Sequence, residues 1–322
     1  MTPALLVSTK GWDPEGWVQR FQALLPDRKV LPTDRTGNFN GPDADLTDVH
    51  YILAWKPLQE TLDRLPALRV IFSLGAGVDH IFAVKRLPDV PIVRIVDPDL
   101  TARMAEYVVW QVLHHIRFGA AYRRQQTEHV WHDLDQPAAG HFTVGLMGFG
   151  IMGAAAADVL GRLGFKLRAW SRSPKTAPGV EMFSGADGLD DFLAGTDILI
   201  ALLPLTPETR GILNLDLLRK LRRNGPLGGA VLINGGRGGS HVEAGIVQAL
   251  REGILVGASL DVFETEPLPK ESPLWDFANV VVTPHVAAVS NPQGLAAGIV
   301  AQIFAYERGE SLRNLVDRER GY

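Results

Sequence analysis

The sequence contains no cysteine among its 322 residues. Disulfide bonds, thiolate metal sites and cysteine nucleophiles are therefore excluded. The chain also has little excess charge of either sign, because 32 lysines and arginines stand against 36 aspartates and glutamates and leave a net charge of −4. Such a balance gives no global attraction to nucleic acid or to anionic lipid.

The most prominent apolar stretch is too short to cross a membrane. It carries no charge from Phe142 to Ala157, and then Asp158 and Arg162 close it. A membrane helix needs about 20 apolar residues, so this stretch is not a membrane anchor. The N-terminus, MTPALLVSTKGW, lacks the basic segment and long apolar segment of a secretory signal. We therefore expect a cytoplasmic protein.

Short apolar runs alternate with helical stretches along most of the chain, which is typical of parallel sheets covered by helices. The apolar runs predict strands at 4–8, 51–55, 69–75, 91–97, 142–147, 166–170, 197–202, 230–234 and 255–260. The fold class predicted is α/β, with two Rossmann-like, doubly wound parallel-sheet domains. A chain of this length suggests about two domains.

The longest helical pattern, residues 101–125, has Thr101 as its expected N-cap and serves as a bridge between the domains. The second domain is complete before the last 30 or so residues, and a further helix starts there. We therefore expect the tail to return to the first domain. The predicted division is a substrate domain, 1–102 and 291–322, into which a dinucleotide-binding domain, 103–290, is inserted.

A glycine cluster joins the strand at 142–147 to the Ala-rich helix that follows it. The motif is G-F-G-I-M-G, with Gly148 permitting a tight turn, Gly150 letting backbone approach a pyrophosphate, and Gly153 letting the helix pack closely on the strand. Ile151 and Met152 open the helix, whose first amides can donate to phosphate. The alternative is a buried turn whose glycines serve packing only. The strand–turn–helix context favours a dinucleotide site.

The next strand indicates which dinucleotide is bound. NAD-binding domains present an acid to the ribose at the end of this strand, but no acid lies between Lys166 and Lys175. Ser171, Arg172 and Ser173 are found there instead. A guanidinium and two hydroxyls suit a 2′-phosphate, which an acid would repel. NADP is therefore the expected cofactor, with a solvated basic loop as the alternative.

Three later segments carry polar groups at strand ends, where open α/β folds bind their ligands. Arg237 lies in VLINGGRGG, Glu266 in ASLDVFETEPLP, and His285 in VVVTPHVAA. Histidine is suited to proton transfer near neutral pH, a carboxylate can orient it and keep it charged, and arginine can hold a carboxylate by forked hydrogen bonds. Each also has a structural alternative: a turn stabiliser, a surface acid and a core histidine.

Six segments in order, LGAGVDHI, GFGIMG, LLPLTPETRGIL, INGGRGG, LDVFETEPLP and TPHVA, resemble the D-isomer-specific 2-hydroxyacid dehydrogenase family over essentially the whole chain. The resemblance implies an NADPH-dependent reductase of small 2-oxoacids, with glyoxylate and hydroxypyruvate as the expected substrates. His285 would be the general acid, Glu266 its partner, and Arg237 the group that holds the substrate.

The resemblance also assigns further binding residues. A nest of amides at Gly75, Ala76 and Gly77 would bind the substrate carboxylate, and Trp55 would limit substrate size. The implied cofactor-binding set is Gly148, Gly150, Ile151, Met152, Gly153, Ser171, Arg172, Ser173, Leu203, Pro204, Asn234, Gly235, Gly236, Asp261 and His285. The family has Ala or Ser before the arginine where this chain has Gly236, which loosens the turn.

Partners and alternatives complete the expectations. The resemblance implies a homodimer formed through the helix at 101–125 and the loop at 129–141, and neither nucleic acid nor membrane is expected as a partner. Two other functions stay open. One is a cofactor-gated regulatory protein of corepressor type, which some members of the family are. The other is a dehydrogenase of a different D-2-hydroxyacid that uses NAD.

Overall fold

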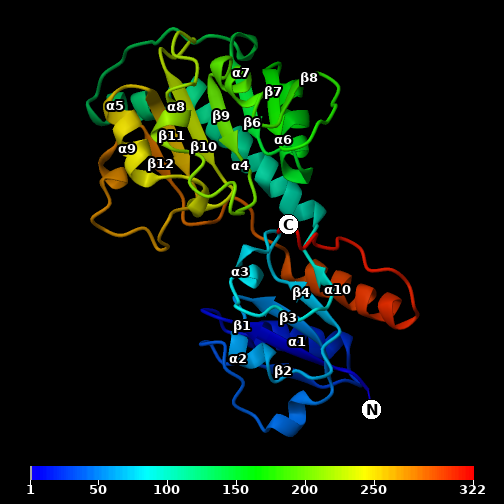
Figure 1. The fold of residues 1–322 in the computed structure, drawn as a ribbon. Helices are drawn as coiled ribbons and strands as arrows, with labels where there is room; N and C mark the ends of the chain where they lie inside the picture. Colours follow the sequence, from blue (N-terminus) through cyan, green and yellow to red (C-terminus); the bar gives the residue numbers. More distant parts are fainter. Residues whose placement is uncertain (1) are drawn as a thin grey trace. The chain divides into compact units, whose positions relative to one another are not determined.

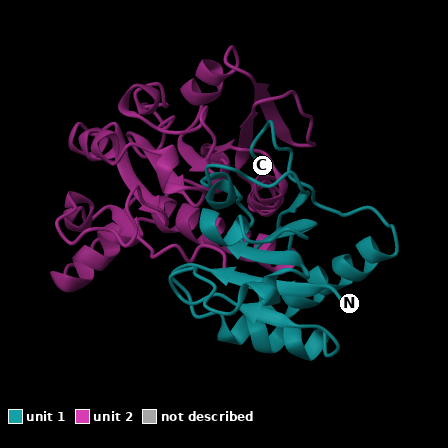
Figure 2. Cartoon of the chain, turned by 60° about the horizontal axis from the view of Figure 1, so that its bottom comes forward, with its two compact units in different colours: residues 1–97, 290–322 teal, residues 98–289 magenta. Residues whose placement is uncertain are grey.

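The computed structural model describes residues 2–322, which divide into two compact units (Figure 2). Unit 1 comprises the chain up to Asp97 together with Ser290–Tyr322, and unit 2 comprises Pro98–Val289. The chain thus leaves unit 1 once and returns to it once. Each unit is built on one parallel sheet (Figure 1). The predicted fold class, two parallel-sheet α/β domains, is confirmed.

Unit 1 has a five-stranded sheet of order β2-β1-β3-β4-β5. Its strands are β1 (Ala4–Thr9), β2 (Val30–Pro32), β3 (Val49–Trp55), β4 (Val70–Ser73) and β5 (Ile92–Val93). Its helices are α1 (Glu15–Leu24), η1 (Asp43–Leu46), α2 (Gln59–Leu62), α3 (Asp79–Phe82) and α10 (Pro292–Glu307). All six residues of β1 are buried, as expected of a central strand covered on both faces.

The predicted strand at 91–97 is wrong in extent, because only Ile92 and Val93 join the sheet. Beside these residues the chain forms hydrogen bonds with the C-terminal tail. The amide of Arg94 donates to Asn314 O at 3.1 Å, and the amide of Val316 donates to Ile92 O at 2.9 Å. The backbone of Ile92 and Arg94 is therefore paired with the tail of the chain.

Unit 2 has a seven-stranded sheet of order β12-β11-β10-β9-β6-β7-β8. Its strands are β6 (Thr143–Met147), β7 (Lys166–Ser171), β8 (Val180–Ser184), β9 (Ile198–Ala201), β10 (Ala230–Asn234), β11 (Leu255–Leu260) and β12 (Val280–Val282). Its helices are α4 (Pro98–Ile116), α5 (Gly119–Thr127), η2 (Ala139–His141), α6 (Ile151–Arg162), α7 (Leu189–Ala194), α8 (Leu215–Leu218), η3 (Gly238–Ser240), α9 (Glu243–Arg251) and η4 (Pro273–Asp276).

Two apolar cores cover the two faces of this sheet. Helices α4 and α6 pack on one face, and α7, α8 and α9 pack on the other. Successive strand residues alternate between the faces: Ile198 and Ile200 of β9 belong to one core, and Leu199 and Ala201 to the other. Burial on both faces makes a central strand such as β9 apolar at every position, which is why its sequence is a continuous hydrophobic run.

The helix predicted at 101–125 is wrong in two respects. It begins at Pro98, so Thr101 lies inside α4 and does not cap it. It is also broken after Ile116, because Phe118 adopts a left-handed conformation with φ of 56° before α5 starts at Gly119. A Cβ at Gly119 would lie 2.4 Å from His114 Nδ1, so the chain turns tightly over the end of α4. Across residues 2–322, no helix combines the length and apolarity that crossing a membrane requires.

Candidate active site

The strand order of unit 2 reverses between β6 and β9, and this switch point is where ligands bind in open α/β sheets. From β6 the chain proceeds to β7 and β8 on one side, and then to β9 and onward on the other side. The carboxyl ends of these parallel strands share one edge of the sheet. The sequence-predicted cofactor and catalytic residues of unit 2 lie at those carboxyl ends or in the segments that follow them.

The glycine loop between β6 and α6 has the geometry that the motif predicts. Gly148 has φ of +105°, and a Cβ there would meet Leu202 O at 2.7 Å, so its backbone is pressed against the segment after β9. A Cβ at Gly153 would lie 2.2 Å from Gly148 O. At Gly150 a Cβ would meet nothing within 4 Å. Two of the glycines therefore serve packing, and the third leaves open space at the N-terminus of α6, which fits an approaching pyrophosphate.

The end of β7 carries the hydroxyl and cationic groups expected to select the cofactor. Ser171 is buried and donates its hydroxyl to Ser173 O at 2.8 Å, which fixes the turn that exposes Arg172. Lys175 donates from Nζ to Phe149 O at 2.6 Å and so ties this turn to the glycine loop. The guanidinium of Arg172 is near enough to Glu208 to lower the pKa of that carboxyl, after the larger effect of a hydrogen bond from Thr206.

The turn after β10 is organised by Asn234, whose side chain is fully buried. Its Oδ1 accepts from the amide of Gly236 at 3.0 Å, and its Nδ2 lies 2.9 Å from His241 Nδ1. Asn234 therefore shapes the turn that presents Arg237, and Arg237 donates from Nη1 to Gly236 O at 2.9 Å. Asn234 was expected to bind cofactor, and in the structure its side chain holds this turn.

Gly236, the departure from the family pattern, lies against backbone. A Cβ there would be 3.0 Å from Leu203 O and 3.2 Å from Leu203 N. The segment after β9, with Leu203 buried and Pro204 half-buried, thus packs closely on the turn after β10. Next to it, a Cβ at Gly238 would be 1.8 Å from Phe263 O. The turn that carries Arg237 is therefore in contact with the segment after β11 that carries Glu266.

His285 and Glu266 are joined by a hydrogen bond of 2.8 Å between Nδ1 and Oε2. An ionised carboxylate only accepts, so Nδ1 carries the proton and Nε2 is the nitrogen left for proton transfer. The other carboxylate oxygen, Oε1, accepts from the amide of Phe263 at 3.1 Å. Both side chains of the pair are about two-fifths exposed, at 41% and 37%. The imidazole is thus oriented and reachable from solvent.

Asp261 follows β11 and is almost fully buried, at 1% exposure. Its Oδ1 accepts from Thr283 Oγ1 at 2.7 Å and from the amide of Val286 at 2.9 Å, and its Oδ2 accepts from the amide of Ala287 at 2.9 Å. Asp261 was expected to bind cofactor. In the structure its carboxylate holds the segment on either side of His285.

In unit 1, Trp55 ends β3 and stacks on Trp12, with ring centroids 4.7 Å apart. Its ring also lies 4.4 Å from that of His80, and a Cβ at Gly75 would meet it at 2.9 Å. The predicted nest has two amide donors for a ligand and not three, because the amide of Gly75 already donates to Ser73 Oγ at 3.0 Å. Ala76 and Gly77, both half-buried, supply the other two amides.

Two polar residues near the catalytic motifs have structural partners. The amide of Glu243 donates to Glu264 Oε1 at 2.6 Å, and the amide of Glu264 donates to Glu243 Oε1 at 2.8 Å. His241 is buried beside Asn234. Neither His241 nor Glu264 is among the predicted site residues, and these contacts account for both side chains. In the part of the chain that the structure describes, no three His, Asp or Glu side chains gather as a metal site would require.

Sequence reasoning did not identify Thr283 and Tyr107. Thr283 stands two residues before His285, and its hydroxyl lies 3.0 Å from Tyr107 Oη on α4. The position of Thr283 beside the catalytic motif was a signal for it. No local pattern distinguishes Tyr107 from the apolar face of its helix.

The sequence is also similar to those of known dehydrogenases and reductases. Residues 109–287 match the family model described as D-isomer specific 2-hydroxyacid dehydrogenase, NAD binding domain. The chain is 42% identical over 317 residues to glyoxylate/hydroxypyruvate reductase A of Escherichia fergusonii, covering 97% of each protein. It is 45% identical over 300 residues to the protein of the same name from Citrobacter koseri, covering 91% of this chain and 94% of that one.

Solved structures resemble the whole chain. One is an NADPH-dependent glyoxylate/hydroxypyruvate reductase from Sinorhizobium meliloti in complex with NADP and sulfate, with a TM-score of 0.92, 47% identity and full coverage of both chains. Another is a probable 2-hydroxyacid dehydrogenase from Rhizobium etli in complex with NADP, HEPES and tartaric acid, with a TM-score of 0.94, 48% identity and full coverage of both chains.

Proposed function

Because the chain belongs to the D-isomer-specific 2-hydroxyacid dehydrogenase family, we propose that it is an NADPH-dependent reductase of small 2-oxoacids, of the glyoxylate/hydroxypyruvate reductase A type. It reduces glyoxylate to glycolate and hydroxypyruvate to D-glycerate. The observation that carries this proposal is the hydrogen-bonded pair of His285 and Glu266, placed at the same sheet edge as the glycine loop.

Reduction of a 2-oxoacid needs a hydride, a proton for the carbonyl oxygen and a cation for the carboxylate. Bound NADPH supplies the hydride. Nε2 of His285 donates the proton, since Nδ1 is engaged by Glu266 and keeps the ring in one orientation. Glu266 stabilises the charged imidazole before transfer, and the backbone amide of Phe263 keeps the carboxylate aligned.

Substrate binding is assigned to a cation and to amides. Arg237 donates forked hydrogen bonds to the substrate, which also polarise its carbonyl group. The amides of Ala76 and Gly77 bind a carboxylate in the manner of a nest. Trp55 is held between Trp12, His80 and Gly75. A ring fixed on several sides is suited to restricting the site to small substrates.

The cofactor is assigned to unit 2. The open space at Gly150 and the first amides of α6 receive the pyrophosphate. Arg172, with the hydroxyls of Ser171 and Ser173 beside it, receives the 2′-phosphate that distinguishes NADPH from NADH. Leu203 and Pro204 would border the nicotinamide, and Asp261 is also assigned to the cofactor site.

We also propose that the enzyme acts as a homodimer in the cytoplasm. Trp110 on α4 is 53% exposed, Trp131 in the loop at 129–141 is fully exposed, and every residue of α5 is at least partly exposed. Exposed tryptophans on α4 and on the loop at 129–141 favour association with a second copy. Sedimentation of wild type and Trp110→Glu tests this: a wild-type dimer that dissociates in the variant is expected, and a wild-type monomer contradicts it.

The activity itself is tested by following NADPH oxidation with glyoxylate and hydroxypyruvate. Wild-type enzyme is expected to turn over both, and His285→Ala is expected to lose about 100-fold or more in kcat. Absence of turnover by folded wild type, or full activity in His285→Ala, would overturn the proposal.

A further inference from the structure

The backbone that presents His285 is in a conformation that must be held. His285 has φ of 55°, a left-handed region that residues other than glycine seldom adopt. Its own amide donates to Asp261 O at 2.8 Å and to Thr283 O at 3.1 Å. Strain of this kind persists only where surrounding contacts enforce it.

The carboxylate of Asp261 supplies most of those contacts. It accepts the hydroxyl of Thr283 before His285, and the amides of Val286 and Ala287 after it. The three hydrogen bonds therefore bracket the strained residue. Because Asp261 is buried at the end of β11, its carboxylate has a fixed place from which to do this.

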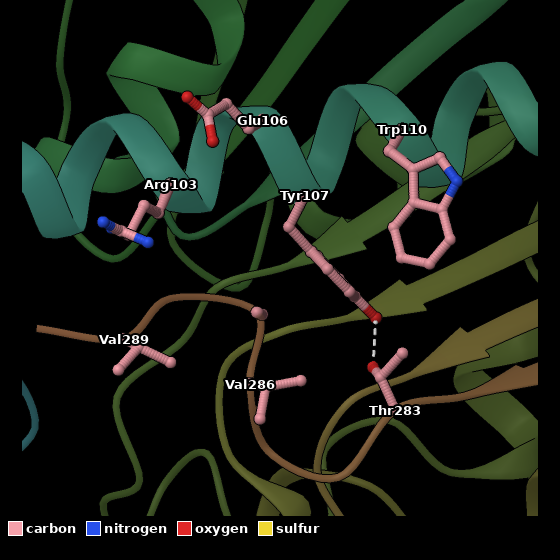
Figure 3. Close-up of a pocket in the computed structure, with 8 residues that line it drawn as sticks. Arg103, Glu106, Tyr107, Trp110, Thr283, Val286 and Val289 are labelled. Carbon is pink, nitrogen blue, oxygen red and sulfur yellow. Dashed lines mark hydrogen bonds between the residues drawn. The ribbon is translucent and has the colours of Figure 1, made fainter.

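The hydroxyl groups in this network can donate their hydrogen bonds in one direction only. The carboxylate of Asp261 accepts, so the single proton of Thr283 Oγ1 points toward it. Thr283 Oγ1 then accepts from Tyr107 Oη at 3.0 Å. Figure 3 shows Tyr107 reaching from α4 to Thr283 along this line. Two successive hydrogen bonds thus connect Tyr107 on α4, through Thr283, to the Asp261 carboxylate that holds the His285 segment.

Apolar packing holds only part of the segment: Ala287 belongs to the core that includes Tyr107 and Val108 of α4, and a cavity lies beside it. A cavity of about 340 Å³ lies between α4 and the residues around His285, and it is lined by Trp110, Val286 and Val289 among others (Figure 3). Val286 and Val289 are both about half exposed. Beside this cavity, the hydrogen bond between Tyr107 and Thr283 links α4 to the segment, in addition to the apolar packing around Ala287.

We propose that Tyr107 and Thr283 are positioning residues for the reduction, which act through Asp261 to keep His285 in its productive orientation. This inference rests on the proposed function for its effect on catalysis. The hydroxyl of Thr283 orients the Asp261 carboxylate, and the hydroxyl of Tyr107 orients Thr283. Neither touches substrate.

The test compares Thr283→Val, which keeps the shape and removes the hydroxyl, with Thr283→Ser, which restores it, and with Tyr107→Phe. Ser259→Ala is the matched control. Ser259 is also buried and bonded to α4, through Gln111 and His115, but it makes no contact with residues 283–287 among the interactions of residues 2–322. Kinetics with glyoxylate are measured alongside hydrogen exchange of the amides at 285–287.

Thr283→Val is expected to lower kcat by about tenfold or more, because small displacements of a catalytic group are costly, while KM for NADPH changes less than about threefold. Its amides at 285–287 are expected to exchange about tenfold faster, and Thr283→Ser restores both quantities. Tyr107→Phe gives a smaller change of the same kind, and Ser259→Ala gives none. Unchanged kcat and exchange in Thr283→Val, or a Thr283→Ser variant as impaired as Thr283→Val, would overturn the inference.

The two proposals fail in different ways. Wild-type enzyme without turnover contradicts the proposed function, whatever the exchange rates. Active wild type with an equally active Thr283→Val contradicts only the positioning role.

Discussion

Glu266 Oε2 and His285 Nδ1 lie 2.8 Å apart although 19 positions separate the two residues. The second oxygen of the same carboxylate accepts from the amide of Phe263. Because both side chains are about two-fifths exposed, water screens their mutual attraction, and the pair contributes little to folding stability. Its consequence is orientation of the ring, which leaves Nε2 as the nitrogen available for the proton transfer proposed above.

Glu266→Gln is expected to lower kcat by about 100-fold, with KM for glyoxylate changed less than about threefold. The amide keeps the shape of the carboxylate but cannot stabilise a charged imidazole. Steady-state kinetics give both constants. Glu264→Gln is the control, since Glu264 lies two positions away and binds the backbone of Glu243 instead. Equal activity of the two variants would contradict the role of Glu266.

Substituting alanine for two glycines of the same loop is expected to affect different properties, namely stability at Gly153 and NADPH binding at Gly150. Gly153→Ala places a Cβ 2.2 Å from Gly148 O, so it should lower the free energy of unfolding by about 1–3 kcal/mol. Gly150→Ala meets nothing within 4 Å in the protein and should unfold like wild type. It should bind NADPH about tenfold more weakly, because one hydrogen bond to a charged phosphate is obstructed.

Urea unfolding and fluorescence titration with NADPH separate these two effects. Gly150→Ala with undiminished NADPH affinity would show that the open space beside Gly150 is not where the pyrophosphate binds. Loss of stability in Gly150→Ala would contradict the structure of the loop itself.

Arg172→Asp is expected to weaken NADPH by about 10- to 150-fold while NADH changes little, because one charge-assisted contact to the 2′-phosphate contributes about 1.5–3 kcal/mol. KM values for both cofactors provide the measurement. Arg251→Asp is the control. It makes the same change of charge at the C-terminal end of α9, close to the amino end of β11 and therefore at the opposite ends of the strands from Arg172. Equal losses for NADPH and NADH would refute the assignment of Arg172.

His115 is expected to make unfolding depend on pH. Burial, with a further contribution from His114, lowers the pKa of His115 to about 3, whereas an unfolded histidine titrates near pH 6.5. The unfolded state therefore binds the extra proton between these values. The free energy of unfolding should fall by up to about 1.4 kcal/mol for each pH unit below 6.5.

His115→Gln removes that titration and keeps a donor for Ser259 Oγ, which His115 Nε2 approaches at 2.8 Å. Its stability should fall less steeply between pH 6.5 and pH 5. Urea unfolding at a series of pH values gives the two slopes. Parallel slopes for wild type and variant would show that His115 does not contribute.

Much of the fold was predictable because its signals are local. The central strands of both sheets are buried on both faces, so runs such as ILIA at 198–201 are apolar at every position. The glycine loop carries its spacing within six residues, and Arg237, Glu266 and His285 each stand in a short motif after a strand. The edge strands β2 and β8 have no such signal: β2 has three residues, and β8 has no fully buried one.

By itself the sequence determined the alternation of strands and helices, the family, and the residue types available for chemistry, because each of these is written in neighbouring positions. Tertiary structure alone decided where the long helix breaks, how the C-terminal tail pairs beside β5, and that Ser73 occupies the amide of Gly75. It also decided that Tyr107 meets Thr283, 176 positions away. Such contacts depend on how whole elements pack, and packing brings together residues whose local sequence contains no sign of the partner.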